Sequence, residues 1–286
     1  MRILHISDLH FWSITCNPIL LLNKRIIGNL NLIARRCRYI HQERADSFIE
    51  VVNDIRPDIL LVGGDLTTTA LAREYAKAAG FLSRLESFCP VIRAIPGNHD
   101  YYTFESCRHN RYEKYLGRYS GWAGEPVSCQ SMGDISLVCI PTVRANICSS
   151  RGFISEAHAA ATLTVIQKAP GKQIIALAHY PYLQRVPEYH SGRTRCLGGA
   201  SLLRETLGRS GRPLLYLAGH VHVFSHRRDS LYNNLTQVTS AALFYGKKKQ
   251  PGGFTEICMN GDTLQIFPWT FCDGWLRGKE SLPMPG

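Results

Sequence analysis

Long hydrophobic runs are absent from this sequence of 286 residues. The uninterrupted aliphatic run at 19–22 has four residues, whereas a membrane-spanning helix needs roughly 20 apolar residues. A secretory signal is not expected either, because Asp8 and His10 interrupt the N-terminal apolar stretch before a hydrophobic region of sufficient length can form. We therefore predict a cytoplasmic protein without a transmembrane helix.

Paired cysteine motifs are also missing, although the chain contains 10 cysteines. The sequence has no CxxC pair and no zinc-type spacing. Cys139 stands in the apolar run at 135–140, which is typical of a small buried side chain. Because cytoplasmic thiols generally stay reduced, we expect most of these cysteines to be buried and assign them no chemistry.

Acidic residues are scarce relative to basic ones. The chain has 33 Lys and Arg against 22 Asp and Glu, a formal net charge of +11. Such an excess suits nucleic acid, phosphorylated substrates or an anionic membrane surface, and it does not choose among them. With 45% hydrophobic and 19% charged residues the chain can bury a sizeable core, which excludes disordered and fibrous classes.

Short apolar runs alternate with helical patterns along the chain. Runs rich in Ile, Leu and Val predict buried strands at Arg2–Ser7, Ile59–Gly63, Val91–Ile95, Ile174–Ala178 and Leu214–Ala218. Helices are predicted over Ala45–Arg56, Ala70–Phe88, Leu202–Leu207, and from the N-cap Ser155 through Lys168. The last third is strand-like at Leu235–Phe244, Phe254–Met259 and Leu264–Phe271, with a hairpin turn at 260–262. No linker or repeat is found, so the sequence predicts one α/β domain.

The segment 19–44 departs from this alternation. Its apolar positions 19, 22, 26, 30, 33, 37 and 40 are spaced three or four apart, which predicts one face of a helix. The opposite face is basic: it carries Lys24, Arg25, Arg35, Arg36, Arg38 and Arg44. Two interpretations stay open. The segment either lies in a membrane interface, at the inner face of a membrane, or packs on its own domain with a solvated cationic face.

Metal-ligand residue types follow the five predicted strands. The clusters are Asp8-Leu-His10, Gly64-Asp65, Gly97-Asn98-His99-Asp100, His179, and Gly219-His220-Val-His222. The carboxyl ends of neighbouring strands converge on one crevice, so these side chains are expected to meet there. Imidazole, carboxylate and amide oxygen together suit Mn, Fe, Zn or Co. Seven candidate ligands are too many for one ion, so we expect two divalent metal ions.

The order and spacing of these five blocks resemble the calcineurin-like metallophosphoesterase superfamily, over Met1 to about Val223. The resemblance implies a two-sheet mixed β-sandwich flanked by helices, here a single domain over 1–286 with an insertion at about 19–44. It implies that Asp8, His10 and His222 hold one metal and that Asn98, His179 and His220 hold the other. Asp65 would bridge the two ions. His99 would be catalytic, donating to the phosphoryl group or leaving oxygen, and Asp100 would orient it.

The resemblance also implies the reaction. Two cations would polarise the phosphoryl oxygens, and a hydroxide activated by the metals would attack phosphorus. Arg185, Arg193 and Arg195 follow His179 and are candidates for binding a second phosphate or a polar head group. A solvated basic loop is the alternative for them. Tyr180 and Tyr182 either line the pocket or pack, whereas His5 and His158 are expected to be structural.

The branches of the superfamily differ in the residues around these motifs, and the differences narrow the class of substrate. Gly64-Asp65 is followed by Leu-Thr-Thr-Thr and Asn98-His99 by Asp100, unlike the protein Ser/Thr phosphatases. The pattern is more similar to bacterial phosphodiesterases and to pyrophosphatases that cleave UDP-2,3-diacylglucosamine. The basic amphipathic segment favours a lipid-linked substrate.

Three other functions stay open at this point. One is a cyclic-nucleotide phosphodiesterase. Another is a nuclease with phosphate contacts at Arg227-Arg228 and Lys247-Lys248-Lys249. The third is a non-catalytic scaffold, which is disfavoured because no ligand position of the family is missing.

Overall fold

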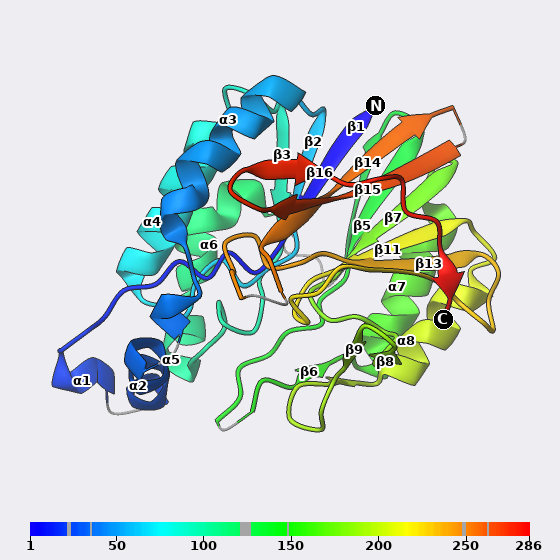
Figure 1. Ribbon diagram of the computed structural model, residues 1–286. Helices are drawn as coiled ribbons and strands as arrows, with labels where there is room; N and C mark the ends of the chain where they lie inside the picture. The colour runs from blue at the N-terminus through cyan, green and yellow to red at the C-terminus, as the bar shows by residue number, and fades with distance from the viewer. Residues whose placement is uncertain (22–23, 35, 121–126, 148, 248–249, 262) are drawn as a thin grey trace.

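The computed structural model describes residues 1–21, 24–34, 36–120, 127–147, 149–247, 250–261 and 263–286. Two mixed β-sheets pack against each other, with helices on their outer faces (Figure 1). Between the sheets lies an apolar layer that includes Ile3, Leu61 and Ile257 from one sheet and Leu177 and Leu217 from the other. The α/β fold with two sheets predicted from the sequence is confirmed.

The first sheet has six strands and is built around the N-terminal strand β1. Its spatial order is β16 (Trp275–Arg277), β15 (Thr263–Phe271), β14 (Gly253–Asn260), β1 (Arg2–Ile6), β2 (Ile59–Val62) and β3 (Val91–Ala94). β1, β2 and β3 are parallel, whereas β14 runs antiparallel to β1 and pairs with β15 as a hairpin. The predicted turn lies between β14 and β15, and its residue 262 is outside the described residues.

The second sheet has seven strands. Its order is β17 (Met284–Pro285), β12 (Ser225–Arg228), β13 (Leu235–Thr239), β11 (Leu214–Ala218), β7 (Gln173–Leu177), β5 (Ile135–Cys139) and β4 (Ser128–Met132). Two short pairs add β6 (Gly152–Phe153) with β10 (Leu197–Gly198), and β8 (Arg185–Val186) with β9 (Tyr189–His190). The predicted strand Leu235–Phe244 is too long. It ends at Thr239, and the chain then crosses to the first sheet, where Ala242 bridges to Ser7.

Helices cover the outer face of each sheet. α3 (Ala45–Ile55) and α4 (Ala72–Leu85) pack on the first sheet, and α7 (Glu156–Lys168) and α8 (Ala200–Arg209) pack on the second (Figure 1). Ser155 caps α7 as predicted, since its side chain accepts a hydrogen bond from the His158 backbone N–H. Two short helices, α5 (Phe104–Arg108) and α6 (Arg111–Leu116), follow β3.

The segment 19–44 is not one helix. It forms α1 (Pro18–Leu21), α2 (Arg25–Ala34) and 3₁₀ turns at Arg36–Arg38 and Gln42–Arg44. Residues 22, 23 and 35, which the predicted helix included, lie outside the described residues. Among the described helices, none combines the length and the apolarity needed to cross a bilayer.

The orientation of α2 also differs from the solvated cationic face considered above. Most of its large apolar side chains are turned to solvent, with Ile27 60% exposed and Leu30 62% exposed, whereas Leu32 is buried. Arg25 is instead fully buried and donates to the backbone carbonyls of Thr69 and Ala70. A sequence pattern groups residues on a face, but it does not say which face packs inward. Here the buried carbonyls and Glu105, which pairs with Arg25 at 3.0 Å, hold Arg25 inward, while Arg38 of the same basic set is exposed.

The described cysteines are free, as expected, but only Cys89 and Cys139 are buried. The expectation that most are buried is therefore wrong, because several stand in exposed loops and on strand faces that turn to solvent, as Cys16, Cys129 and Cys272 do. Cys148 lies outside the described residues.

Candidate metal centre

Five strands, three from the first sheet and two from the second, bring the candidate ligands together. Asp8 follows β1, Asp65 follows β2 and Asn98 follows β3, while His179 follows β7 and His220 follows β11. The carboxyl ends of these strands lie side by side because β1, β2 and β3 are neighbouring parallel strands in one sheet, and β7 and β11 are neighbouring parallel strands in the other. The predicted convergence is thus produced by two sheets rather than by one.

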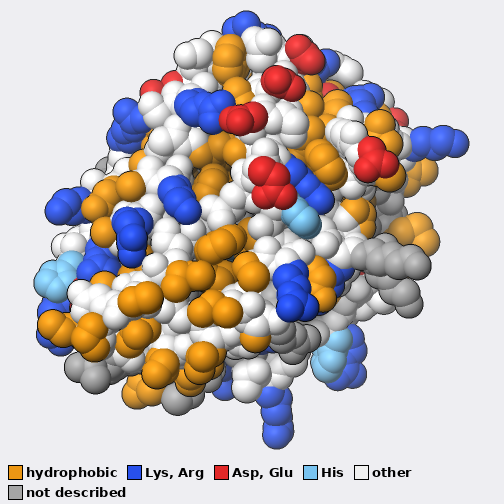
Figure 2. Space-filling model, turned by 60° about the vertical axis from the view of Figure 1, so that its left-hand side comes forward, with side chains coloured by type: hydrophobic (Ala, Val, Ile, Leu, Met, Phe, Trp, Pro, Cys, Tyr) orange, Lys and Arg blue, Asp and Glu red, His pale blue; other side chains and the backbone are white. Residues whose placement is uncertain are grey.

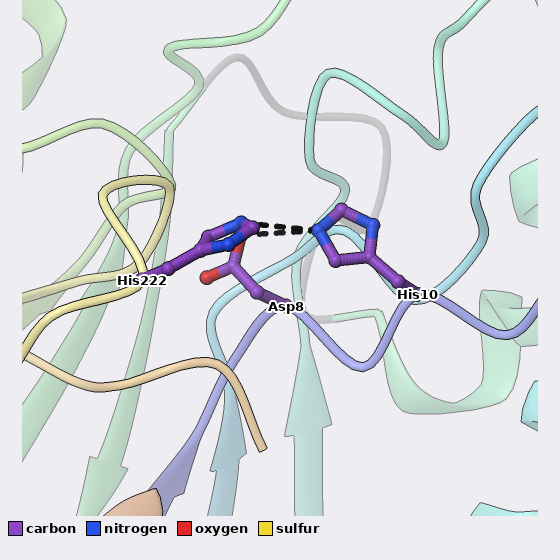
Figure 3. A group of neighbouring side chains, drawn as sticks. All are labelled: Asp8, His10 and His222. Atoms are coloured by element: carbon purple, nitrogen blue, oxygen red, sulfur yellow. Dashed lines mark hydrogen bonds and ion pairs between the residues drawn. The ribbon is translucent and has the colours of Figure 1, made fainter. Parts of the chain in front are cut away.

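The first group of side chains comprises Asp8, His10 and His222 (Figure 3). Nε2 of His10 lies 3.1 Å from Nε2 of His222, and Oδ1 of Asp8 lies 3.2 Å from the latter nitrogen. Figure 3 shows the two imidazole rings pointing toward one another with the carboxylate beside His222. Asp8 Oδ1 is buried and has no hydrogen-bond partner among the described residues. A divalent cation between these atoms would satisfy that oxygen, so the donor set fits a metal.

The second group comprises Asp65, His179 and His220, with the amide of Asn98 at its centre. Asn98 Oδ1 lies 3.2 Å from Nε2 of His179 and 3.0 Å from Nδ1 of His220. Nδ1 of His179 contacts the carbonyl oxygen of Gly63 at 2.8 Å, which orients the ring and leaves Nε2 to face the site.

Asp65 stands between the two groups. Its Oδ2 lies 4.0 Å from Nε2 of His10 and 3.5 Å from Nε2 of His179, while Oδ1 accepts the backbone N–H of His99 at 2.7 Å. One carboxylate therefore reaches a histidine of each group, which is the arrangement a bridging ligand requires.

The backbone at these positions is in a sparsely populated conformation. Asp8, His10, Asp65, His220 and His222 all have positive φ, between 52° and 69°. This left-handed conformation is uncommon outside glycine and collects at functional sites, where the surrounding structure maintains it. The sequence carries no sign of it.

Glycines allow the loops to approach one another. A Cβ atom on Gly97 would lie 2.2 Å from the backbone nitrogen and from Oδ1 of Asp65. A Cβ on Gly219 would lie 1.8 Å from Ser7 Oγ and 2.5 Å from Asp8 Oδ2. The glycines before Asn98 and His220 are therefore there for close approach, as the sequence suggests.

Burial and neighbouring charges set the protonation states. Burial lowers the pKa of His220 to about 3, and burial together with His99 lowers the pKa of His10. Although burial opposes it, the carboxylate of Asp65 raises the pKa of His179 to about 9. Neutral imidazoles and ionised carboxylates are the forms that bind metal ions, so a metal ion at the second group would have to displace the proton that Asp65 stabilises on His179.

His99 and Asp100 lie at the same edge, but they are not bonded as expected. The His99 ring uses Nδ1 toward the carbonyl oxygen of Thr68, at 2.5 Å. Asp100 accepts hydrogen bonds from the backbone N–H groups of Leu66, Thr67 and Gly97. It therefore fixes the two loops that carry Asp65 and His99, rather than contacting the imidazole itself.

Arg36 is a site residue that the sequence pattern placed only on the basic face of a helix, facing either a membrane or solvent. Its Nη1 lies 3.3 Å from Nε2 of His99. With Asn31, Tyr39, Arg195, His222, Tyr245 and Lys247 it lines a pocket of about 350 Å³. The residue follows α2, and nothing in the helical pattern indicates that the chain turns inward there.

Only one of the three predicted substrate arginines lines this pocket. Arg195 does so, and its carbonyl oxygen contacts Nε2 of His220 at 2.8 Å. Arg185 instead contacts His190 in the β8–β9 hairpin, and Arg193 is exposed; neither lines the pocket. Tyr180 lies against the second group, with its hydroxyl 3.2 Å from Asn98 Oδ1, whereas Tyr182 packs on Tyr216.

The phosphate contact proposed at Arg227 is wrong. Its guanidinium is buried and paired with Glu188, so it is not available to nucleic acid. Residues 248 and 249 of the same nuclease hypothesis lie outside the described residues. His5 is buried and bonded to Ser240, in line with a structural role.

Comparison with known proteins agrees with this geometry. The family model described as calcineurin-like phosphoesterase matches residues 1–224. The chain belongs to this family. It is a metal-dependent phosphoesterase. A comparison with curated proteins found no match.

Solved structures of other proteins share the fold. A dimetal phosphatase from Danio rerio superposes with a TM-score of 0.65 at 13% identity, covering 98% of this chain and 99% of that one. A structure of PhoD gives 0.60 at 7% identity, with 100% of this chain and 73% of that one covered. At these identities the likeness concerns the fold alone.

Proposed function

We propose that this phosphoesterase cleaves a phosphodiester or pyrophosphate bond with two metal ions held by seven side chains. Asp8, His10 and His222 would hold one ion, Asn98, His179 and His220 the other, and Asp65 would bridge them. The observation that carries the proposal is the position of Asp65 Oδ2, within 4.0 Å of a histidine from each group. When bound, the ions would polarise phosphoryl oxygens and activate water.

His99 is the proposed catalytic side chain. It is 8% exposed, and its ring packs edge-on against His10 with 4.9 Å between the centroids. A phosphoryl group seated at the metals would therefore meet the imidazole on one side. Its Nδ1–H is held by the Thr68 carbonyl, so Nε2 faces the site as an acceptor for Arg36; it stabilises the leaving oxygen by donation after it takes up a proton when the anionic substrate binds.

The substrate we favour is lipid-linked, of the kind represented by UDP-2,3-diacylglucosamine. Support comes from the exposed apolar side chains of α1 and α2, which are Ile19, Ile26, Ile27, Leu30 and Ile33. Figure 2 shows hydrophobic side chains gathered over the lower part of this face, with Lys and Arg side chains around them. Exposed apolar surface beside cationic residues suits an anionic bilayer.

The apolar face is continuous with the cleft. Asn31 of α2 and Arg36, just after it, line the pocket beside His222. A lipid whose acyl chains stayed in the bilayer under α2 could thus present its head group to the metal centre without leaving the membrane. The exposed face and the metal centre are in this way two parts of one substrate path, and the membrane contact we propose is peripheral.

The experiment is Mn²⁺-dependent hydrolysis of UDP-2,3-diacylglucosamine, read by mass spectrometry beside a generic aryl phosphodiester. Release of UMP and the lipid monophosphate supports the full proposal. Cleavage of the aryl diester alone retains the chemistry and rejects this substrate. No cleavage of either compound by metal-loaded protein contradicts the proposal as a whole.

Binding to liposomes tests the membrane contact separately. We expect Ile27→Ser with Leu30→Ser to reduce binding to anionic liposomes by about tenfold or more, because each removes an exposed apolar side chain worth up to about 1.5–3 kcal/mol when fully buried. Leu231→Ser, at a side chain that is 70% exposed on the β12–β13 loop, is the matched control. Equal binding of all three proteins would remove the lipid argument.

A further inference from the structure

The pocket beside the metal centre is cationic and has no acidic side chain in its lining. Arg36, Arg195 and Lys247 contribute three positive charges to about 350 Å³, and Tyr39 and Tyr245 contribute aromatic walls. Within the part of the chain that the structure describes, none of the three cations forms an ion pair with a carboxylate. The Lys247 ammonium lies instead over the two rings, 4.7 Å from the Tyr39 centroid and 5.5 Å from that of Tyr245.

Three elements that are distant in sequence supply these charges. Arg36 comes from the 3₁₀ turn after α2, Arg195 from the loop between β9 and β10, and Lys247 from the segment between β13 and β14. Like charges held together without a counter-ion repel one another, and an anion that enters between them removes this repulsion. Two guanidinium groups also match the oxygens of a phosphoryl group in a way that a lone ammonium does not.

The pocket adjoins the metal centre on two sides. His222, a candidate ligand, lines the pocket, and its ring lies 5.4 Å from that of Tyr245. Arg36 reaches His99 from the other side. A substrate whose reacting phosphorus lies at the metals would therefore extend its next group directly into the cationic pocket.

We propose that this pocket binds a second phosphoryl group of the substrate, adjacent to the one that is cleaved. The inference rests on the proposed function and selects, within it, a pyrophosphate linkage over an isolated diester. The volume exceeds that of a phosphoryl group alone, so the sugar or nucleoside attached to the second phosphate lies against Tyr39 and Tyr245. Arg195 and Lys247 are binding residues of this subsite, and Arg36 serves both phosphoryl groups.

Calorimetric titration of metal-free protein with methylenebisphosphonate tests the subsite without turnover. We expect saturable binding to the wild type and a loss of about tenfold or more in affinity for the double variant Arg195→Gln, Lys247→Gln, since hydrogen bonds between charged groups are stronger than those between neutral ones. Lys172→Gln, at an exposed lysine beside the opposite end of β7, is the matched control and should bind as the wild type does. Absence of saturable binding, or equal affinity of double variant and wild type, would overturn the subsite.

Kinetics separate the subsite from the proposed function. The ratio of kcat/KM for a nucleoside diphosphate sugar to kcat/KM for an aryl diester should fall about tenfold in the double variant. Hydrolysis with an unchanged ratio overturns the subsite but retains the phosphoesterase chemistry. Bisphosphonate binding without hydrolysis of any ester retains the subsite and overturns the proposed function. An oligonucleotide that displaces bisphosphonate better than the nucleotide sugar does would overturn the pyrophosphate assignment in favour of a nucleic acid backbone.

Discussion

Nη1 of Arg36 lies 3.3 Å from Nε2 of His99, although the two residues are 63 positions apart in the chain. His99 follows β3 in the core fold, whereas Arg36 follows α2, which carries the exposed apolar face. Because Nδ1–H of His99 is held by the Thr68 carbonyl, Nε2 accepts from the guanidinium. The segment formed by α2 and the turn after it thus has two contacts: its exposed apolar side chains face solvent, and its Arg36 contacts the candidate catalytic histidine.

Removal of the His99 imidazole should slow the reaction without emptying the site. For His99→Ala we expect turnover of an aryl diester to fall by about 10²–10⁴, the usual contribution of a positioned proton donor. Metal content, measured by atomic emission, should stay at the wild-type level, because His99 is not among the proposed ligands. Turnover close to wild type would contradict the role given to this residue.

Gly97 provides a steric test of the centre. In Gly97→Ala the new methyl group would stand 2.2 Å from the backbone nitrogen and Oδ1 of Asp65, so the carboxylate must move. We expect weaker metal binding and a large loss of turnover, with the circular dichroism spectrum retained. Gly80→Ala is the control, because a methyl group there would meet no described atom within 4 Å beyond its own helix. Normal metal affinity in Gly97→Ala would show that metal binding does not depend on the present position of the Asp65 carboxylate.

Arg25 should anchor α2 to the domain. It is fully buried, pairs with Glu105 and donates to two backbone carbonyls. We expect Arg25→Met to destabilise the protein by about 1–3 kcal/mol, because the two buried carbonyls lose their donor while Glu105 keeps Arg111 as a partner. Limited proteolysis should then cut first within α2, with Arg84→Met, at an exposed pair on α4, as the control. Unchanged protease resistance and unfolding free energy would show that α2 is held by other contacts.

Acid should weaken a second ion pair. Burial acts to raise the pKa of Asp229, but hydrogen bonds from the Arg204 side chain and the Leu231 backbone outweigh it, and the pKa is lowered. A carboxyl group whose pKa is lower in the folded state stabilises the fold above its unfolded pKa, and this stability is lost as pH falls through the folded value. The loss should thus appear below about pH 4.

Urea unfolding at two pH values measures this contribution. Asp229→Asn should cost about 1–2 kcal/mol at pH 7 and less near pH 3, where the wild-type carboxyl also begins to take up protons. Asp54→Asn, at an exposed carboxyl on α3, is the control. An equal cost at both pH values would show that the Asp229 charge does not contribute.

The sequence predicts the centre better than its surroundings, for physical reasons. Asp8, Asp65 and Asn98 each follow a short apolar run, and parallel strands must end at one edge, so the meeting of these side chains is predictable. The inward position of Arg36 is not predictable from the sequence. Arg36 follows α2, which is held in place by hydrogen bonds from Arg25 to the backbone carbonyls of two residues more than 40 positions away. Likewise the sequence does not distinguish Arg185 from Arg195, because both follow His179. In the structure Arg185 belongs to the β8–β9 hairpin and does not line the pocket, whereas Arg195 does.

The central claim is that Asp65 bridges two metal ions, and anomalous diffraction from crystals soaked in Mn²⁺ tests it most directly. We predict two peaks roughly 3.5–4 Å apart, one beside Asp8, His10 and His222 and the other beside Asn98, His179 and His220, with the Asp65 carboxylate between them. A single peak at full occupancy, or peaks that leave Asp65 without a metal contact, would contradict the account.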